Sequence, residues 1–402
     1  MLVPFLTFTF LFLMTYFQVF GGPSFVSPLP HQSFGFLLAS ESEGASASAA
    51  LVGEEATPTS KVVGPAAPAG PKKVAPPPAA KVTNTGTFPG TGRANNKFGM
   101  YMLPNVGQVP EVAKLINSNG GDWGYVLIPV FITDRSPEQL QPFFTTLKEH
   151  HLIPIIQLSA HNFAPGSFDW PGIANFLGTL EWPANSRYIT IFNETNDEKY
   201  WGHKIAPEEY GVALSDAITA FKAASPQFFI MNGAFNSSAR SGSQYLSQDV
   251  YMQRMNNAAP GIFKRLDGWA THPYPQPEFS GDYYNPPSHY QTRDQIRNYE
   301  WEMSLLRNYG VSGLPIFITE TGWAHKEGNQ PKKEYKPAAT TAKYFDDAYR
   351  NHWLPHPQIV AIAPFIWKME IASNFEWVKP DGTFYPQYDV VKNIPKVKGS
   401  PN

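Results

Sequence analysis

The sequence predicts an α/β fold, specifically a (β/α)8 TIM barrel over residues 97–396. Three observations lead to this prediction. Short apolar runs alternate with helical stretches along the whole region. Each run is continuously apolar, which is typical of parallel strands buried on both faces. Eight such strands, separated by helical stretches, in about 300 residues match the usual size of this barrel.

The expected strands are rich in β-branched and aromatic residues, and the expected helices lie between them. The strands lie at 98–103, 125–131, 153–160, 187–193, 228–235, 266–274, 315–320 and 360–367. The helices lie at 110–119, 137–150, 171–181, 207–224, 243–258, 291–309 and 337–353. The helix at 207–224 has the clearest pattern, because Pro207 stands at its first turn and apolar residues recur behind it at helical spacing.

A doubly wound open sheet also alternates strands and helices, so it is the main alternative fold. Such a sheet usually carries a glycine-rich phosphate loop, G-x-G-x-x-G, after its first strand. Here the first expected strand runs into YMLPNVGQVPEV at residues 101–112, which lacks that pattern. We therefore favour the barrel over the open sheet.

The N-terminal segment is strongly apolar. Residues 2–20 carry no charged side chain, and their number is close to that needed to cross a bilayer. We expect residues 1–22 to form a hydrophobic signal peptide or membrane anchor, and the protein to be extracellular or membrane-anchored facing outside. The segment begins without Lys or Arg, so flanking positive charge does not indicate its orientation. A buried core helix is the alternative, but the neighbouring stretch offers it no core.

That neighbouring stretch has the composition of a spacer. Residues 44–87 contain no aromatic residue and consist mainly of Ala, Pro, Gly, Ser and Thr. Such a segment cannot bury enough apolar surface to offset the chain entropy lost on folding. We therefore predict a disordered Ala/Pro-rich linker over residues 23–96.

The overall composition argues against several kinds of partner and site. A net charge of −2 provides no electrostatic basis for binding nucleic acid. The chain has no Cys, which excludes disulfides and thiolate metal sites. Its ten His residues are scattered and form no H-E-x-x-H pattern, so we expect no metal and no other cofactor. We expect a monomer.

Two carboxylates stand at the ends of expected strands of the barrel. Glu194 comes directly after the run at 187–193, and Glu320 ends the run at 315–320. In a barrel the chemistry lies where strands end, and two side chains from opposite strands can meet over its narrow centre. Two facing carboxylates, one protonated and one ionised, are the minimum apparatus for glycoside hydrolysis. Asn193, beside Glu194, is placed to hydrogen-bond a sugar.

Other polar and aromatic residues fall at the same rim. They are His161, Arg135, His272, Tyr274, Trp323 and Trp367. Taken singly, each has a structural explanation. The His272-Pro273-Tyr274 sequence fits a rigid turn, Trp367 fits a core residue, and His161 fits a rim histidine with an ordinary hydrogen bond. The pair of Glu residues, each after a clean apolar run, is the feature that favours catalysis over a capping or solvated role.

These motifs resemble the retaining β-glycosidases of clan A. FNETND at the fourth expected strand and ITETGW at the seventh, with their Glu residues 126 positions apart, carry the resemblance. HPY at the sixth strand and Trp367 at the eighth fit the same pattern, so the resemblance covers the whole 97–396 region. ETGW is similar to endo-β-1,3-glucanases and galactanases, while HPY and AHN are similar to glycoside hydrolase family 5. The family within the clan stays open.

The resemblance implies roles for the residues that match. Glu194 would be the general acid and then the general base. Glu320 would be the nucleophile that forms a covalent glycosyl-enzyme. Asn193 would contact the 2-hydroxyl of the sugar at the cleavage point, and Tyr274 would hydrogen-bond Glu320. His272 would help shape this subsite.

Trp367 would be a stacking platform for the sugar. Two departures from the clan pattern stand out. Many clan members carry an Arg on strand 2 next to the nucleophile, where this chain has Leu127. Arg135, further along, is a candidate substitute. The Pro that usually comes after Asn-Glu is replaced by Thr195.

The sequence thus predicts a retaining glycoside hydrolase that cleaves O-glycosidic bonds of a β-linked polysaccharide or oligosaccharide. A non-catalytic carbohydrate-binding barrel of the cell envelope is the alternative, although such a protein would not need both Glu residues. A metal-dependent barrel hydrolase is less favoured. Enzymes resembling amidohydrolases place His-x-His at the end of strand 1, where this chain has Leu103-Pro104-Asn105. The glycan, and endo or exo action, stay open.

Overall fold

The computed structural model describes residues 86–159, 168–282 and 292–401. Within them the chain forms parallel strands in two sheets, ordered β1-β2-β3-β4-β5 and β6-β7-β8. The strands are β1 (Gly99–Tyr101), β2 (Gly124–Phe131), β3 (Leu152–Ser159), β4 (Arg187–Ile191), β5 (Phe228–Asn232), β6 (Trp269–Thr271), β7 (Ile316–Ile318) and β8 (Ile359–Ile362). Each lies within one residue of an expected run or inside it, and the predicted α/β class is confirmed.

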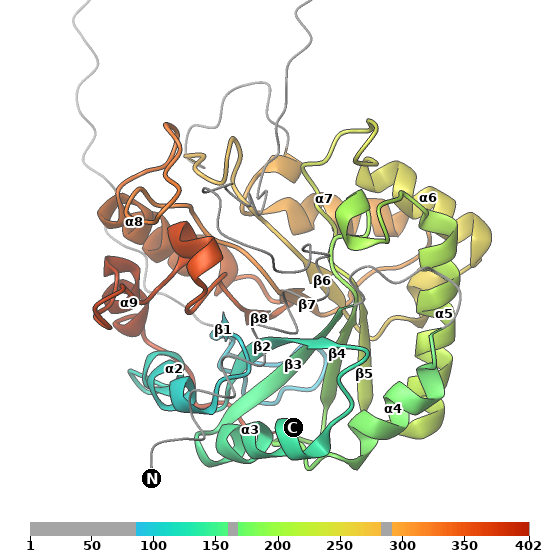
Figure 1. The fold of residues 1–402 in the computed structure, drawn as a ribbon, viewed down its shortest axis with the longest axis horizontal. Coiled ribbons are helices and arrows are strands. Elements are labelled where there is room, and N and C mark those ends of the chain that lie inside the picture. The colour runs from blue at the N-terminus through green and yellow to red at the C-terminus, as the bar shows by residue number, and fades with distance from the viewer. Residues whose placement is uncertain (1–85, 160–167, 283–291, 402) are drawn as a thin grey trace, which may run out of the picture.

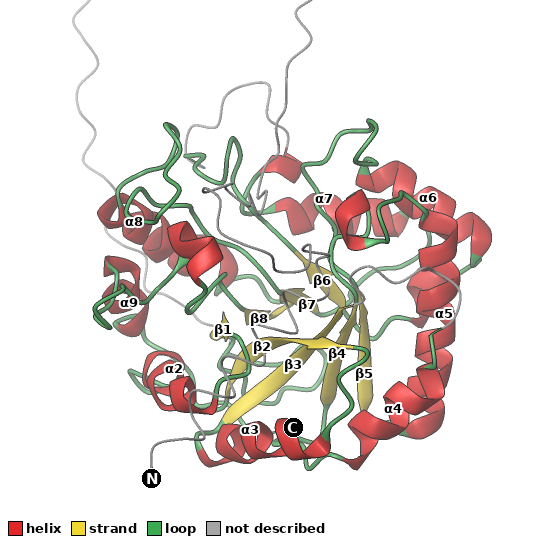
Figure 2. Cartoon of the chain, in the orientation of Figure 1, coloured by secondary structure: helices red, strands yellow, loops and turns green. Residues whose placement is uncertain are grey.

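Helices alternate with these strands and surround them (Figures 1 and 2). They are α2 (Val109–Ile116), α3 (Pro137–Glu149), α4 (Trp170–Thr179), α5 (Pro207–Ala224), α6 (Gln248–Ala258), α7 (Asn298–Arg307), α8 (Ala338–Ala348) and α9 (Pro386–Lys392). A π-helical turn, Tyr349–Trp353, extends α8 to the end of its expected range. Helix α5 has the predicted bounds, whereas the short α9 was not expected.

Single parallel bridges bring the edges of the two sheets together. Met231 of β5 pairs with Gly268, just before β6. Phe98, just before β1, pairs with Ile362 of β8, whose amide donates to the carbonyl of Lys97 at 2.8 Å. The edge strands of the two sheets are therefore adjacent, β5 to β6 and β1 to β8.

The core has two parts, one between the strands and the helices and one among the strands themselves. Large aromatic side chains fill the inner part. The ring of Tyr188 lies 5.2 Å from Phe317, 5.1 Å from Phe229 and 6.1 Å from Tyr125, measured between centroids. Burial of each such side chain stabilises the fold by about 1.5–3 kcal/mol. A filled interior leaves the strand ends as the place for a site.

Part of the segment assigned to the linker packs against the folded region. Phe88 is 7% exposed and meets Phe229 edge-on at 6.4 Å. Asn95 donates to the carbonyl of Val360 at 2.9 Å and accepts from the Tyr125 hydroxyl at 2.7 Å. Ordered packing therefore begins before residue 97.

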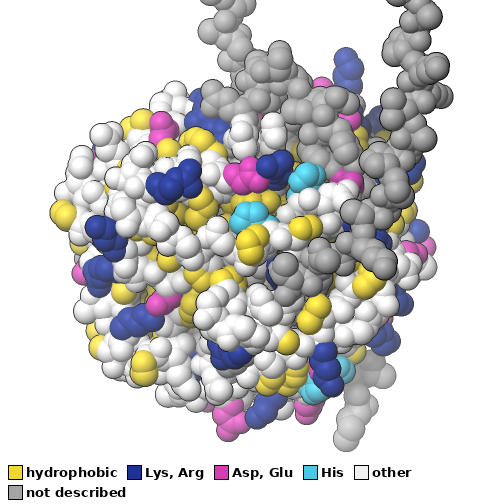
Figure 3. Space-filling model, turned by 180° about the vertical axis from the view of Figure 1, so that it is seen from behind, with side chains coloured by type: hydrophobic (Ala, Val, Ile, Leu, Met, Phe, Trp, Pro, Cys, Tyr) yellow, Lys and Arg dark blue, Asp and Glu magenta, His cyan; other side chains and the backbone are white. Residues whose placement is uncertain are grey.

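The expected N-terminal anchor and most of the expected linker lie outside the described residues. In the part of the chain that the structure describes, no helix is both long and apolar enough to span a bilayer. On the face seen in Figure 3, Lys and Arg side chains are interspersed with Asp and Glu. This face therefore carries mixed charge.

Candidate active site

The chain turns sharply where β4 ends. Phe192 has φ 71° and Glu194 has φ 36°, both in the left-handed region that non-glycine residues seldom adopt. The Glu194 amide donates to the carbonyl of Ala234 at 2.8 Å, which anchors the turn to the neighbouring segment. Gly233 permits this close approach, since a Cβ there would lie 2.5 Å from the carbonyl oxygen of Ile191. Strained backbone of this kind is concentrated at functional sites.

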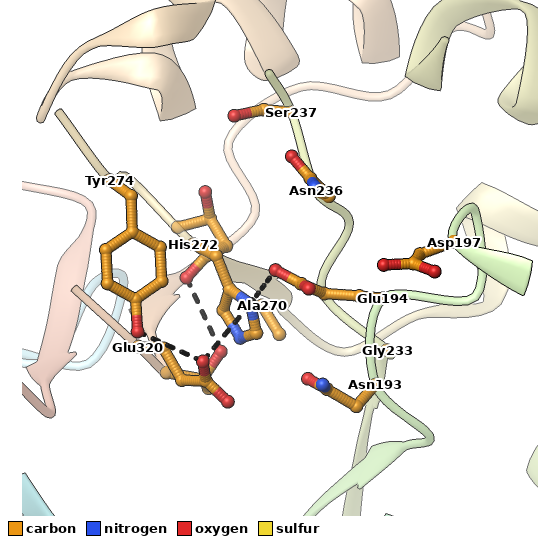
Figure 4. Close-up of polar contacts among 12 residues, drawn as sticks. Asn193, Glu194, Asp197, Gly233, Asn236, Ser237, Ala270, His272, Tyr274 and Glu320 are labelled. Carbon is orange, nitrogen blue, oxygen red and sulfur yellow. Dashed lines mark hydrogen bonds and ion pairs between the residues drawn. The ribbon is translucent and has the colours of Figure 1, made fainter. Parts of the chain in front are cut away.

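Glu194 and Glu320 meet at one imidazole. His272, just after β6, places its Nδ1 3.0 Å from Glu194 Oε1 and 3.8 Å from Glu320 Oε2 (Figure 4). The separation of those two oxygens cannot exceed the sum of the two distances, and this range includes the spacing of about 5–5.5 Å found in retaining glycosidases. The expected convergence of the two carboxylates is therefore present.

Neutral groups hold the Glu320 carboxylate from both sides. The Tyr274 hydroxyl donates to Oε2 at 3.2 Å, which is the contact that the resemblance implied. Gln157 Nε2 donates to Oε1 at 3.4 Å and also to Asn193 Oδ1 at 2.9 Å. The side chain of Glu320 is 11% exposed and that of Glu194 is 13% exposed. Both carboxylates are thus largely desolvated yet open to one side.

The environment shifts the pKa values of the two carboxyl groups in opposite directions. Burial alone raises the pKa of Glu194, but the hydrogen bond and charge of His272, with Lys199 nearby, outweigh it and hold that pKa below its usual range. Burial also raises the pKa of Glu320, and the Glu194 carboxylate adds to the effect. Burial lowers the pKa of His272, but the two carboxylates more than offset it and raise that pKa. The pKa of Glu194 is therefore shifted below its usual range and that of Glu320 above it.

A charged loop beside Glu194 belongs to the site and escaped the sequence analysis. Lys199 Nζ lies 2.9 Å from Asp197 Oδ2 and 4.8 Å from the centroid of the Tyr200 ring. Burial raises the pKa of Tyr200, and the negative charges of Glu194 and Glu320 raise it too. The run of charged residues directly after the fourth strand was a visible signal for this loop.

The two tryptophans expected at the rim are core residues. Trp367 is 3% exposed, and its ring packs against Phe384 at 5.7 Å and against Tyr388 of α9 at 6.2 Å. Trp323 is 1% exposed and donates from Nε1 to the carbonyl of Gly281 at 3.0 Å. The interpretation of Trp367 as a stacking platform is wrong, because α9 covers its ring. Trp323 is equally inaccessible to a sugar.

Arg135 is held by another partner. Its Nη1 forms an ion pair with Asp169 Oδ2 at 2.7 Å, next to the start of α4. Among the described residues it has no contact with Glu320, so it does not take the place of the strand-2 Arg of the clan. Gln157 contacts that carboxylate instead. His161 lies outside the described residues.

Three residues near the carboxylates were missed by the sequence analysis. Gln157 interrupts the apolar run of strand β3, which was a readable signal. The Tyr101 hydroxyl donates to it at 3.0 Å. Phe365 is half-buried, and its ring meets Tyr101 edge-on at 5.1 Å. Phe365 is therefore an aromatic side chain close to the site, with no signal in its sequence context.

The described residues include no cluster of three or more His, Asp or Glu side chains that could hold a metal ion. The site brings together two carboxylates, an imidazole and the neutral donors around them. Such a set can transfer protons and can attack an electrophilic carbon.

Comparisons with known proteins point to the same fold. No protein-family model matches the chain, and no curated protein matches it in sequence. Among solved structures it is similar to GH5_18 from Streptomyces cattleya in complex with GlcNAc, at 12% identity over 74% of this chain and 79% of that chain, with a TM-score of 0.50. At this identity the likeness shows the fold alone, an α/β arrangement of parallel strands.

Two further solved structures are similar at lower TM-scores. One is a GH128 subgroup II endo-β-1,3-glucanase from Sorangium cellulosum, at 16% identity over 74% of this chain and 98% of that chain, with a TM-score of 0.49. The other is the catalytic domain of a mannanase from Streptomyces sp. SirexAA-E, at 16% identity over 81% and 93%, with a TM-score of 0.44.

Proposed function

We propose that this protein is a retaining glycoside hydrolase of clan A type, acting on a β-linked polysaccharide or oligosaccharide by double displacement. One observation carries the proposal. Glu194 and Glu320, from the ends of β4 and β7, both lie within 3.8 Å of the same nitrogen of His272. The likeness in fold to GH5_18 supports it.

In the first step the Glu320 carboxylate attacks the anomeric carbon while the bond to the leaving oxygen breaks. Glu194 donates its proton to that oxygen. In the second step Glu194 takes a proton from water, and the hydroxide displaces Glu320 from the anomeric carbon. Asn193 would hydrogen-bond the 2-hydroxyl of the sugar during both steps.

The pKa directions constrain this mechanism. The first step needs a proton on Glu194 and none on Glu320, whereas in the free protein the pKa of Glu194 is lowered and that of Glu320 is raised. His272 Nδ1 lies within 3.8 Å of both carboxylates, so we infer that the imidazole passes a proton from Glu320 to Glu194 when substrate binds, which leaves Glu320 ionised and Glu194 protonated. Glu194, Glu320 and His272 then titrate as a coupled set. The pKa values seen in the pH–rate profile belong to that set and not to any one of the three residues.

The architecture completes the proposal. The bridges that join β5 to β6 and β1 to β8 support a closed eight-stranded (β/α)8 barrel. The apolar run at residues 2–20 supports export or membrane anchoring, with the proposed linker holding the barrel away from the membrane. The protein would act on its glycan as a monomer.

A hydrolysis screen tests the function. The protein would be incubated with β-glucan, mannan, xylan and galactan, with binding measured in parallel and products identified. Release of sugars with retained configuration is expected. Binding without turnover across the panel would instead favour a non-catalytic carbohydrate-binding barrel.

Variants test the assignment of the two carboxylates. Glu320→Ala should abolish turnover, and azide should partly rescue it and give a glycosyl azide of inverted configuration. Glu194→Ala with azide should give the retained configuration, because the covalent intermediate still forms. The reverse pattern would exchange the two roles.

A further inference from the structure

A chain of hydrogen bonds crosses the interior from β1 to β7 and ends on the site. The Tyr101 hydroxyl donates to Gln157 Oε1 at 3.0 Å. The amide nitrogen of Gln157 then donates to Asn193 Oδ1 at 2.9 Å and to Glu320 Oε1 at 3.4 Å. Tyr101 is 6% exposed and Gln157 is 3% exposed, so water does not compete for these contacts. A buried network of this kind has a defined geometry.

The partners of Gln157 determine how its amide is oriented. A flipped amide would turn Oε1 toward the carbonyl oxygen of Asn193 and the carboxylate of Glu320, which are both acceptors. The hydroxyl of Tyr101 instead donates to Oε1 and leaves both amide hydrogens for the site. Asn193 is oriented in turn, because its Oδ1 is occupied and its Nδ2 has no hydrogen-bond partner among the described residues. Asn193 thereby presents a donor.

The groups that contact the Glu320 carboxylate are mainly uncharged. Leu127, paired with Tyr101 between β1 and β2, is fully buried and apolar. Among the residues that the structure describes, Gln157 and Tyr274 donate to the Glu320 carboxylate, and both are uncharged. Within the described residues, the basic group in contact with this carboxylate is the imidazole of His272, at 3.8 Å. If an arginine contacted this carboxylate, its charge would provide most of the stabilisation of ionised Glu320. Here the hydrogen bond from Gln157 provides a larger share of it.

We propose that Gln157, oriented by Tyr101, is a positioning residue that holds Asn193 and Glu320 in their reactive geometry by neutral hydrogen bonds. This inference rests on the proposed function. The hydrogen bond from Gln157 favours the ionised carboxylate and lowers the pKa of Glu320 against the effect of burial. Loss of that bond would raise the pKa further and move the acid limb of the kcat/KM profile to higher pH.

Two variants and their combination test the network. Gln157→Met keeps an unbranched side chain of similar length and removes the amide, so kcat should fall at least about tenfold, the effect of losing one hydrogen bond to a charged group. Tyr101→Phe removes only the orienting hydroxyl and should lower kcat about two- to fivefold. The double variant should be no slower than Gln157→Met alone, because the hydroxyl acts through the amide.

A control variant separates this role from the general loss of an amide that donates a hydrogen bond. Gln358 is half-buried and donates to the carbonyl of Leu314 at 3.1 Å, before β8 begins. Gln358→Met should leave the pH–rate profile unchanged. Equal effects of Tyr101→Phe in the presence and absence of Gln157 would overturn the proposal.

A titration that needs no turnover completes the test. Protein labelled with ¹³C at the Glu carboxyl carbons would be titrated by NMR, with the Glu320 signal assigned from Glu320→Gln. In Gln157→Met the Glu320 signal should titrate at higher pH than in the unchanged protein, and an unchanged titration would overturn the inference. If the protein cleaves no glycan of the panel, the proposed function fails and this titration still decides whether Gln157 stabilises the carboxylate.

Discussion

Two buried carboxyl groups in this protein are similar in burial and different in their surroundings. Glu320 lies just after β7 and is 8% exposed, while Glu302 on α7 is fully buried behind β6. Burial raises the pKa of both groups. A raised pKa therefore does not distinguish a reactive carboxyl group from a structural one.

Their partners distinguish them. Glu302 is enclosed by neutral donors, with Gln248 Nε2 at 2.8 Å and Trp269 Nε1 at 3.0 Å. Glu320 faces a second carboxylate and an imidazole that contacts both, and part of its side chain reaches solvent. A second titrating group and access for a substrate convert a buried carboxyl group into a candidate nucleophile.

The largest expected effect concerns the reactive group. Glu320→Gln should lower kcat by about 10⁴-fold or more, because a neutral amide cannot form the covalent intermediate. Its thermal midpoint should stay the same or rise, since a buried carboxyl group beside another carboxylate is removed. Turnover assays and thermal unfolding measure the two effects. Turnover above about one-hundredth of the starting rate would contradict the assignment of Glu320 as the reactive carboxyl group.

The second-largest effect is expected when the imidazole of His272 is replaced. His272→Gln should reduce kcat/KM by about 10²–10³-fold, the usual contribution of a positioned proton donor. The pKa of Glu194 should rise in this variant, because His272 holds it down, and both limbs of the pH–rate profile should therefore move. Kinetics from about pH 4 to pH 9 measure this. A profile that falls in height without moving would show that His272 has only a packing role.

Replacing Glu302, the structural carboxyl group, should lower the stability of the fold. Glu302→Leu leaves the donors of Gln248 and Trp269 without an acceptor, which costs about 1–3 kcal/mol for each unpaired group. Urea unfolding at neutral pH measures the loss. The kcat of the folded variant should stay within about threefold of the starting value, because Glu302 touches neither carboxylate of the site. A large fall in kcat without loss of stability would place Glu302 in the reaction.

The smallest expected effect concerns how the free energy of unfolding varies with pH. The pKa of Glu302 is raised in the folded protein, so the native state keeps a proton at pH values where the unfolded chain has lost it. The contribution of this group to stability is therefore full below the ordinary Glu range and is lost as pH rises toward the folded pKa. Glu302→Gln should remove this slope. Unfolding free energies at several pH values between about 4 and 8 measure it, and identical slopes in both proteins would exclude the effect.

Local patterns in the sequence were enough to predict the elements and the positions of the two carboxylates. Helix α5 has the predicted bounds because its first-turn proline and its apolar spacing are local signals. Glu194 and Glu320 come shortly after β4 and β7, where the local sequence predicts the strands to end, and the ends of parallel strands lie at one edge of a sheet. These properties need only neighbours along the chain.

Only the tertiary structure decided which side chains face the site. Trp367 stands after a strand, as Glu194 does, but α9 packs over its ring, and no pattern near Trp367 predicts that contact. Gln157 reaches Glu320 across strands whose side chains meet only once the sheets curve together. The direction of each pKa shift depends on the same long-range contacts, because burial and charge act through space and not along the chain.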